Sequence, residues 1–269
     1  MAPLIRGHLA VLIGRKFQMK QINYQGYFLS ILFIVLIYFF TRGYYSLFTW
    51  FLLGLFLLLA FLKEENRLFA WVMISFFGGN LILFYTDKFI EGYQFIPFYR
   101  VIINQVLFLI PILSICYVIK QFNKKISFFF KKLELNNSNK HFYIILIPLS
   151  VVVTFLFINN SGSDFNMFLS LISFTLIHAF LQEVIWRGIL LTQLIKITNK
   201  TSAILFTSIA FAMNTTIFGF STAFVLLYLF LGFIFALLTI KYKSILPSIF
   251  AHTLVLIFFY LNDWLQLPL

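Results

Sequence analysis

Long apolar runs recur along this chain, and they limit what it can fold into. A helix needs about 20 residues to cross a hydrocarbon layer about 30 Å thick. A lone strand would leave its backbone groups unsatisfied in lipid, so each span must be a helix. The sequence therefore predicts an all-α, polytopic membrane helical bundle with about eight to nine transmembrane helices. The candidate spans are 24–41, 43–62, 68–85, 101–119, 142–158, 165–186, 202–219, 222–240 and 245–262.

Charge is scarce and unevenly distributed. The chain is 62% hydrophobic and 10% charged, which excludes an ordinary soluble globule, and its net charge is +12. Arg42, Lys88 and Arg100 are the Lys and Arg residues of one set of alternate loops. The other set holds sixteen, in 1–23, 63–67, 120–141, 196–201 and 241–244. This positive-inside pattern predicts a multipass protein of the cell membrane with its N-terminus in the cytoplasm and its C-terminus outside. It also explains the net charge without a nucleic-acid partner.

The longest basic loop, 120–141, divides the chain into an N-terminal four-helix region, 1–141, and a second membrane region, 142–269. The loop is either an ordinary positive-inside connection or a short amphipathic piece on an anionic leaflet. The first 20 residues are basic with a short apolar core, so we expect no cleaved signal peptide. Cys116, the single cysteine, lies within a span and is expected to pack there.

One acidic residue, Glu183, lies inside a predicted span, whereas the other seven acids lie in loops or at span ends. An ionisable group in a bilayer costs about 2.5–3.5 kcal/mol on insertion scales, so it marks a candidate functional site. Arg187 follows four residues later and shares the same helix face. The two residues either neutralise one another, with Arg187 extending toward the headgroups, or contribute to a site.

Polar residues of two other spans reach compatible depths. His252 lies about 10 Å into the last span, and Asn214 and Thr215 lie about 20 Å into the seventh. We therefore expect a polar pocket that these residues form with Glu183 and that opens toward the cytoplasm. His178 is either a packed core residue or a ligand. No H-E-x-x-H pair is present, so we expect no metal and no cofactor.

Three short motifs in the last hundred residues contain most of these side chains. They are "QEVIWRG" with Gln182, Glu183 and Arg187, "FAMNT" with Phe211 and Thr215, and "HTLVL" with His252 and Leu256. In order and spacing they resemble the EExxxR, FxxxH and HxxxN motifs of the CAAX protease and bacteriocin-processing (Abi) family of glutamate-dependent intramembrane endopeptidases. The resemblance covers about 165–262. It implies a candidate catalytic set of Gln182, Glu183, Arg187, Thr215 and His252.

Three motif positions depart from the family pattern. The resemblance implies that the first glutamate and the FxxxH histidine activate water, while the HxxxN pair stabilises the oxyanion. Gln182 has no titratable carboxylate, and Thr215 cannot replace imidazole as a base. Leu256 offers no donor to an oxyanion. The family mechanism is therefore expected to be impaired.

Two functions remain in view. The first is a membrane scaffold that keeps the family fold and binds a partner in its polar groove. The alternative is an active endopeptidase that cleaves peptides or membrane proteins through an altered site with Glu183 and His252. A transporter is a weaker third option, because paired broken spans are not evident. Besides membrane lipids, the expected partner or substrate is a membrane protein or a peptide.

Overall fold

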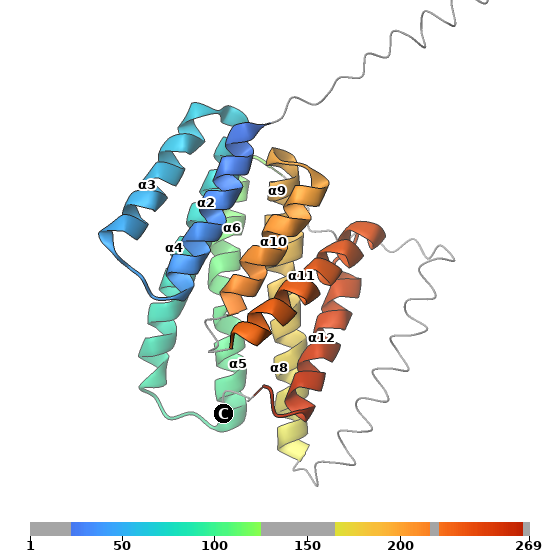
Figure 1. The fold of residues 1–269 in the computed structure, drawn as a ribbon. Helices are drawn as coiled ribbons and strands as arrows, with labels where there is room; N and C mark the ends of the chain where they lie inside the picture. Colours follow the sequence, from blue (N-terminus) through green and yellow to red (C-terminus); the bar gives the residue numbers. More distant parts are fainter. Residues whose placement is uncertain (1–22, 125–164, 216–220, 266–269) are drawn as a thin grey trace, which may run out of the picture.

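The structure is a computed structural model that describes residues 23–124, 165–215 and 221–265 (Figure 1). Its elements are α2 (Tyr24–Thr41), α3 (Leu47–Leu62), α4 (Glu64–Glu91), α5 (Pro97–Leu107), α6 (Leu109–Gln121), α8 (Phe165–Glu183), η1 (Val184–Leu190), α9 (Leu191–Ile197), α10 (Lys200–Asn214), α11 (Thr222–Tyr242) and α12 (Leu246–Leu261). Predictions for 1–20, for most of the 120–141 loop and for the 142–158 span fall outside the described residues.

Five helices are long and apolar enough to cross a membrane: Tyr24–Thr41, Asn66–Glu91, Phe98–Gln121, Met167–Ile197 and Thr222–Tyr242. Two shorter apolar helices, Leu47–Leu59 and Leu246–Leu261, accompany them. These lengths and compositions support the predicted helical membrane bundle but not the count of eight to nine spans. The predicted span 202–219 is a helix of 15 residues that ends at Asn214, while the 165–186 span continues to Ile197.

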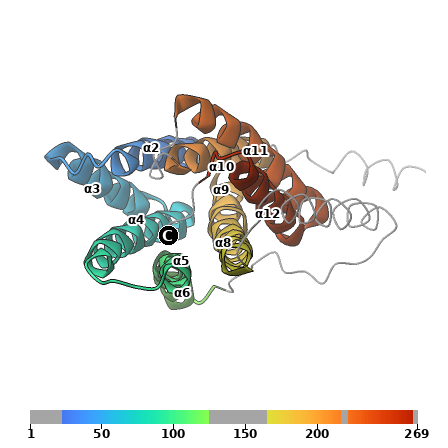
Figure 2. The same ribbon diagram turned by 90° about the horizontal axis from the view of Figure 1, so that it is seen from below.

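The described helices form two groups that pack side by side (Figures 1 and 2). In the first, α4 packs against α3 and α6, and in the second, α10 packs against α11, and α12 against α8. Contacts of α2 with α10 and of α5 with α8 join the groups. Phe76 of α4 also lies edge-on to Trp186 of η1, with ring centroids 5.7 Å apart. The predicted boundary near residue 141 lies outside the described residues.

The bundle has two chemically different ends. At the first, Lys63 at the α3–α4 junction donates to Asn23, and Asn199 at the α9–α10 junction donates to Tyr27. We call this the basic end, because the connections there belong to the lysine-rich set. At the opposite end, which we call the far end, lie the α2–α3 and α4–α5 connections, the start of α8 and the end of α12 (Figure 1). That the basic end faces the cytoplasm stays a prediction.

A glycine allows α4 and α6 to approach closely. A Cβ added to Gly79 would lie 2.5 Å from the Cα of Pro111, whereas one added to the neighbouring Gly78 would meet nothing within 4 Å. We therefore expect Gly79→Ala to lower the free energy of unfolding by about 1–3 kcal/mol through overpacking. Gly78→Ala is the matched control and should raise it by up to about 1 kcal/mol, because alanine favours the helix. Chemical denaturation in mixed micelles measures both, and equal effects would contradict this packing.

Candidate functional site

The candidate site begins where the helix of α8 changes its winding. After Glu183, the residues Val184–Leu190 form a π-helical stretch, and all seven are buried. Such stretches are rare and often occur at functional sites, because they rotate the following side chains relative to a regular α-helix. Here the stretch contains Arg187 and keeps it in reach of Glu183. Sequence periodicity gave no signal for this local change.

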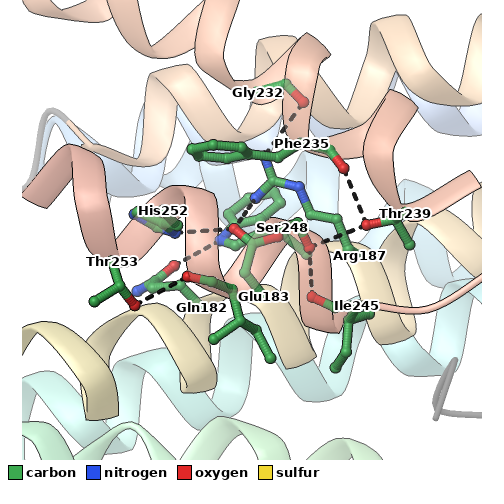
Figure 3. Close-up of polar contacts among 12 residues, drawn as sticks. Gln182, Glu183, Arg187, Gly232, Phe235, Thr239, Ile245, Ser248, His252 and Thr253 are labelled. Carbon is green, nitrogen blue, oxygen red and sulfur yellow. Dashed lines mark hydrogen bonds and ion pairs between the residues drawn. The ribbon is translucent and has the colours of Figure 1, made fainter. Parts of the chain in front are cut away.

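Glu183 is the centre of a buried polar network (Figure 3). Its Oε1 accepts from Arg187 Nη1 at 3.0 Å, and His252 Nδ1 of α12 lies 2.9 Å from the same oxygen. Glu183 is 0% exposed, and Arg187 and His252 are each 1% exposed. The predicted pairing of Glu183 with Arg187 is therefore present, and it includes the histidine as well.

Arg187 points into the bundle rather than toward the headgroups, contrary to the self-paired, surface-reaching interpretation. Its Nη2 donates to the carbonyl of Gly232 at 3.3 Å. Its guanidinium carbon lies 4.2 Å from the ring centroid of Phe211 and 5.2 Å from that of Phe235. These cation–π contacts and the Glu183 carboxylate compensate the cation, so burial of Arg187 does not require lipid headgroups.

A small cavity of about 30 Å³ lies beside this network. A water needs about 10–15 Å³ of such volume, so the cavity has room for about two waters. It is lined by Phe174, His178, Gln182, Phe211, Asn214, Thr215, Tyr228, His252, Leu256 and Leu265. The structure thus brings Gln182, Thr215, His252 and Leu256 together around one space. Glu183 and Arg187 do not line it, and Glu183 lies at the Nδ1 side of His252.

Several cavity side chains already have partners. The Gln182 carbonyl oxygen accepts from Trp186 Nε1 at 2.8 Å, and the Thr215 hydroxyl donates to the carbonyl of Ala212 at 2.6 Å. Leu256 contributes only hydrocarbon. The lining also includes two imidazoles, the side-chain type most often used as a general base.

His252 is held in a definite orientation. Its ring stacks on Phe235 at 5.0 Å, and its Nδ1 faces Glu183. With Glu183 ionised, the proton belongs on Nδ1, which leaves Nε2 as an acceptor. Nε2 is buried and has no hydrogen-bond partner within the described part of the chain. A carboxylate that orients a histidine in this way is a recurring arrangement for a general base.

His178 is the second imidazole at the cavity, and sequence reasoning left its role open. Its Nδ1 lies 2.9 Å from Oε1 of Gln105. Its ring stacks on Phe174 and lies edge-on to the ring of His252, with centroids 6.1 Å apart. Its spacing of four residues from Gln182 was a usable signal. Gln105 was missed, because it lies on α5, outside the region of the motifs.

A much larger cavity of about 1090 Å³ adjoins the small one at the far end. The two share Phe174, Asn214 and Leu265 as lining residues. We expected the polar pocket to open toward the cytoplasm, which is the predicted side of the basic end. The lining continues into the large cavity toward the far end, where α8 begins. Which side of the membrane the far end faces is not shown, so the opening toward the cytoplasm stays a prediction.

A metal centre has little support in the described ranges. They contain no group of three or more His, Cys, Asp or Glu side chains placed to bind an ion. The two imidazoles and Glu183 do not converge on a common point, because Glu183 is bound at the Nδ1 side of His252. The expectation of no metal and no cofactor stays a prediction.

Comparison with known proteins finds a family match over the region that contains the three motifs. No curated protein and no solved structure shows a significant match to the chain. Residues 164–258, about a third of the chain, match the family described as type II CAAX prenyl endopeptidase Rce1-like. The match contains α8, η1, α9, α10, α11 and most of α12, and therefore every motif residue of the small cavity. Through residues 164–258 this membrane protein thus carries an Rce1-like region, in agreement with the resemblance that its motifs indicated.

Proposed function

We propose that this protein is a multipass membrane protein with an Rce1-like intramembrane site that binds a polypeptide segment and does not hydrolyse it by the family chemistry. The observation that carries the proposal is the lining of the small cavity. Gln182, Thr215 and Leu256 stand around it at the positions where the resemblance places a base, a second base and an oxyanion donor.

Hydrolysis in such a site needs a base within hydrogen-bond reach of the attacking water. The carboxamide of Gln182 cannot take a proton from water, and its oxygen already accepts from Trp186. Glu183 keeps its carboxylate, but Arg187 and His252 occupy one oxygen, and the side chain does not line the cavity. The Glu183 carboxylate is thus on the Nδ1 side of His252, out of reach for taking a proton from water in the cavity.

Binding of a polypeptide segment requires hydrogen-bonding groups in the site but no general base. Carboxamides, hydroxyls and imidazoles can hydrogen-bond the amides of a segment inserted among the helices. Interhelical hydrogen bonds of this kind in lipid contribute about 0.6–2 kcal/mol each. Asn214, Gln182 and His178 supply such groups at the cavity wall. Packing against Phe174 and Leu256 adds to these hydrogen bonds.

A second candidate is an endopeptidase with an altered site. The observation in its favour is the Glu183–His252 contact of 2.9 Å, together with the Nε2 of His252, which has no partner among the described residues. In that mechanism His252 is the base, Glu183 orients it, and no donor at Leu256 stabilises the oxyanion. We rank it second, because the step with the greatest charge development would have lost a donor that typically contributes about 100-fold or more.

Site-specific photo-crosslinking tests the binding proposal. Crosslinkers are placed at Thr215 and Leu256 in the small cavity, and at Leu226 of α11 as a control, which is 63% exposed and outside both cavities. We expect adducts with an intact polypeptide at the two cavity positions and adducts with lipid at Leu226. The same lipids at all three positions, with no enriched polypeptide, would remove the support for a binding groove.

A further inference from the structure

The large cavity has a composition that the intramembrane site does not explain. It lies between the two groups of helices at the far end, and its wall includes residues of α2, α4, α5, α8 and α11. At about 1090 Å³ it is at the upper end of the volumes that ligand sites have. Most of its wall comes from residues before 124, outside the Rce1-like match.

Its wall carries charges of both signs. The ionisable side chains are Arg42, Asp87, Glu91, Arg100 and Asp263. Arg100 also donates to the carbonyl of Ile90, which fixes it beside the end of α4. Ionisable groups at membrane depth generally face protein or a water-filled cavity rather than lipid. The cavity is therefore expected to hold water, and its charges nearly cancel.

Carboxamides continue this polar wall inward. Asn80, Asn104 and Gln105 line the large cavity, and Asn214 lines both cavities. Gln105 is the partner of His178, which lines only the small cavity. A polar path thus leads from the charged rim at the far end to the imidazoles near Glu183.

The wall chemistry selects among possible occupants. An acyl chain gains nothing from buried carboxamides and would leave them unsatisfied. An anionic headgroup meets three carboxylates and two guanidinium groups. A polypeptide segment presents N–H donors and C=O acceptors together, which carboxamides pair on both sides, and it fits the aromatic wall between them.

We propose that the large cavity is the entrance to the intramembrane site and admits an extended polypeptide segment from the far end. The identity of the occupant as a polypeptide rests on the proposed function. The direction from which it enters does not depend on that function. With the predicted orientation, the segment arrives from outside the cell. The N-terminal helices, which the family match does not include, then form half of the entrance.

Cysteine accessibility in the full-length protein tests the entrance. In a Cys116→Ser background, Asn104→Cys places a thiol in the cavity wall. Val106→Cys is the matched control, because Val106 lies on the same helix, is 47% exposed and is outside the cavity. The protein is reconstituted in one orientation, and a charged, impermeant methanethiosulfonate is added on either side.

We expect Asn104→Cys to react at least about tenfold faster from the far-end side than from the basic-end side, because reaction requires a hydrated thiolate. Val106→Cys should react slowly from both sides, because a lipid-facing thiol stays protonated. Equal rates at the two positions, or faster reaction of Asn104→Cys from the basic end, would overturn the entrance. Absence of reaction from both sides would also overturn the proposed entrance, because the reagent could then not reach the cavity wall.

The occupant is tested in the same samples. The probe is a pool of N-acetylated, C-amidated random peptides of about ten residues, which reach about 30 Å when extended. We expect the pool to slow modification of Asn104→Cys by about threefold or more through occupancy of the cavity. If the peptides have no effect, but modification slows when phosphatidylglycerol replaces phosphatidylcholine in the membrane, the cavity binds lipid and the proposal is overturned. Peptide cleavage by the wild type would refute the proposed function and leave these rates unaffected.

Discussion

Replacing Arg187 by methionine is expected to destabilise the protein by about 3–5 kcal/mol, because it leaves the Glu183 carboxylate buried without its cation. Glu183 is 0% exposed, and His252 would remain beside its Oε1. The substitution also removes the donor to the Gly232 carbonyl and the contacts with Phe211 and Phe235. Chemical denaturation in mixed micelles measures the loss. Lys200→Met, at an exposed position, is the control and should stay within about 0.5 kcal/mol of wild type.

The double variant Glu183→Gln, Arg187→Met separates the ion pair from packing. The carboxamide introduced by Glu183→Gln would still accept from His252, and no unpaired charge would remain, so the double variant should be more stable than Arg187→Met alone. A coupling energy of about 0.5–3 kcal/mol is the range for residues in contact. Strict additivity of the two substitutions, or an Arg187→Met variant as stable as the control, would show that the network is not what stabilises this part of the bundle.

Restoring the three departed positions is expected to create or raise peptidase activity. The variant combines Gln182→Glu, Thr215→His and Leu256→Asn, all of which line the small cavity. A positioned general base contributes about 100-fold to 10,000-fold, and an oxyanion donor contributes about 100-fold or more. The carboxylate introduced by Gln182→Glu can keep the hydrogen bond from Trp186, because a carboxylate oxygen replaces the amide oxygen.

The measurement for this variant is cleavage of membrane-peptide substrates by purified protein, followed by mass spectrometry. Tyr228 also lines the cavity but is not a motif residue, so Tyr228→Phe in the triple variant is a matched control and should leave the gain intact. A triple variant that folds like wild type and cleaves no faster would mean that the cavity lacks something other than these three groups.

The sequence predicted the helices better than their arrangement. The predicted spans 24–41 and 222–240 correspond to Tyr24–Thr41 and Thr222–Tyr242, because uninterrupted apolar runs leave little choice in lipid. The predicted end at residue 186 was wrong, since the helix continues to Ile197. The charged residue Arg187 follows residue 186 directly and was interpreted as lying beyond the span. It is instead paired inside the bundle with Glu183 and two aromatic rings.

The site was predictable where its members share a helix or a motif. Spacing of four residues indicated the Glu183–Arg187 contact, and the motifs indicated Gln182, Thr215 and His252, whose chemical roles stay predictions. The continuation of the small cavity into the large one was not predictable, because depth along each helix does not say which helices pack together. The contact of His178 with Gln105, 73 residues away in the chain, has no local signal.

Cleavage by the wild-type protein itself, compared with Glu183→Gln and His252→Gln, tests most directly whether the site binds without hydrolysing. Each protein is incubated with the same membrane peptides, and products are identified by mass. We predict that wild type releases no more product than protein-free membranes and that the two variants do not differ from it. Cleavage by the wild type that either substitution abolishes, in a variant that remains folded, would contradict this and establish His252, oriented by Glu183, as the base of an active endopeptidase.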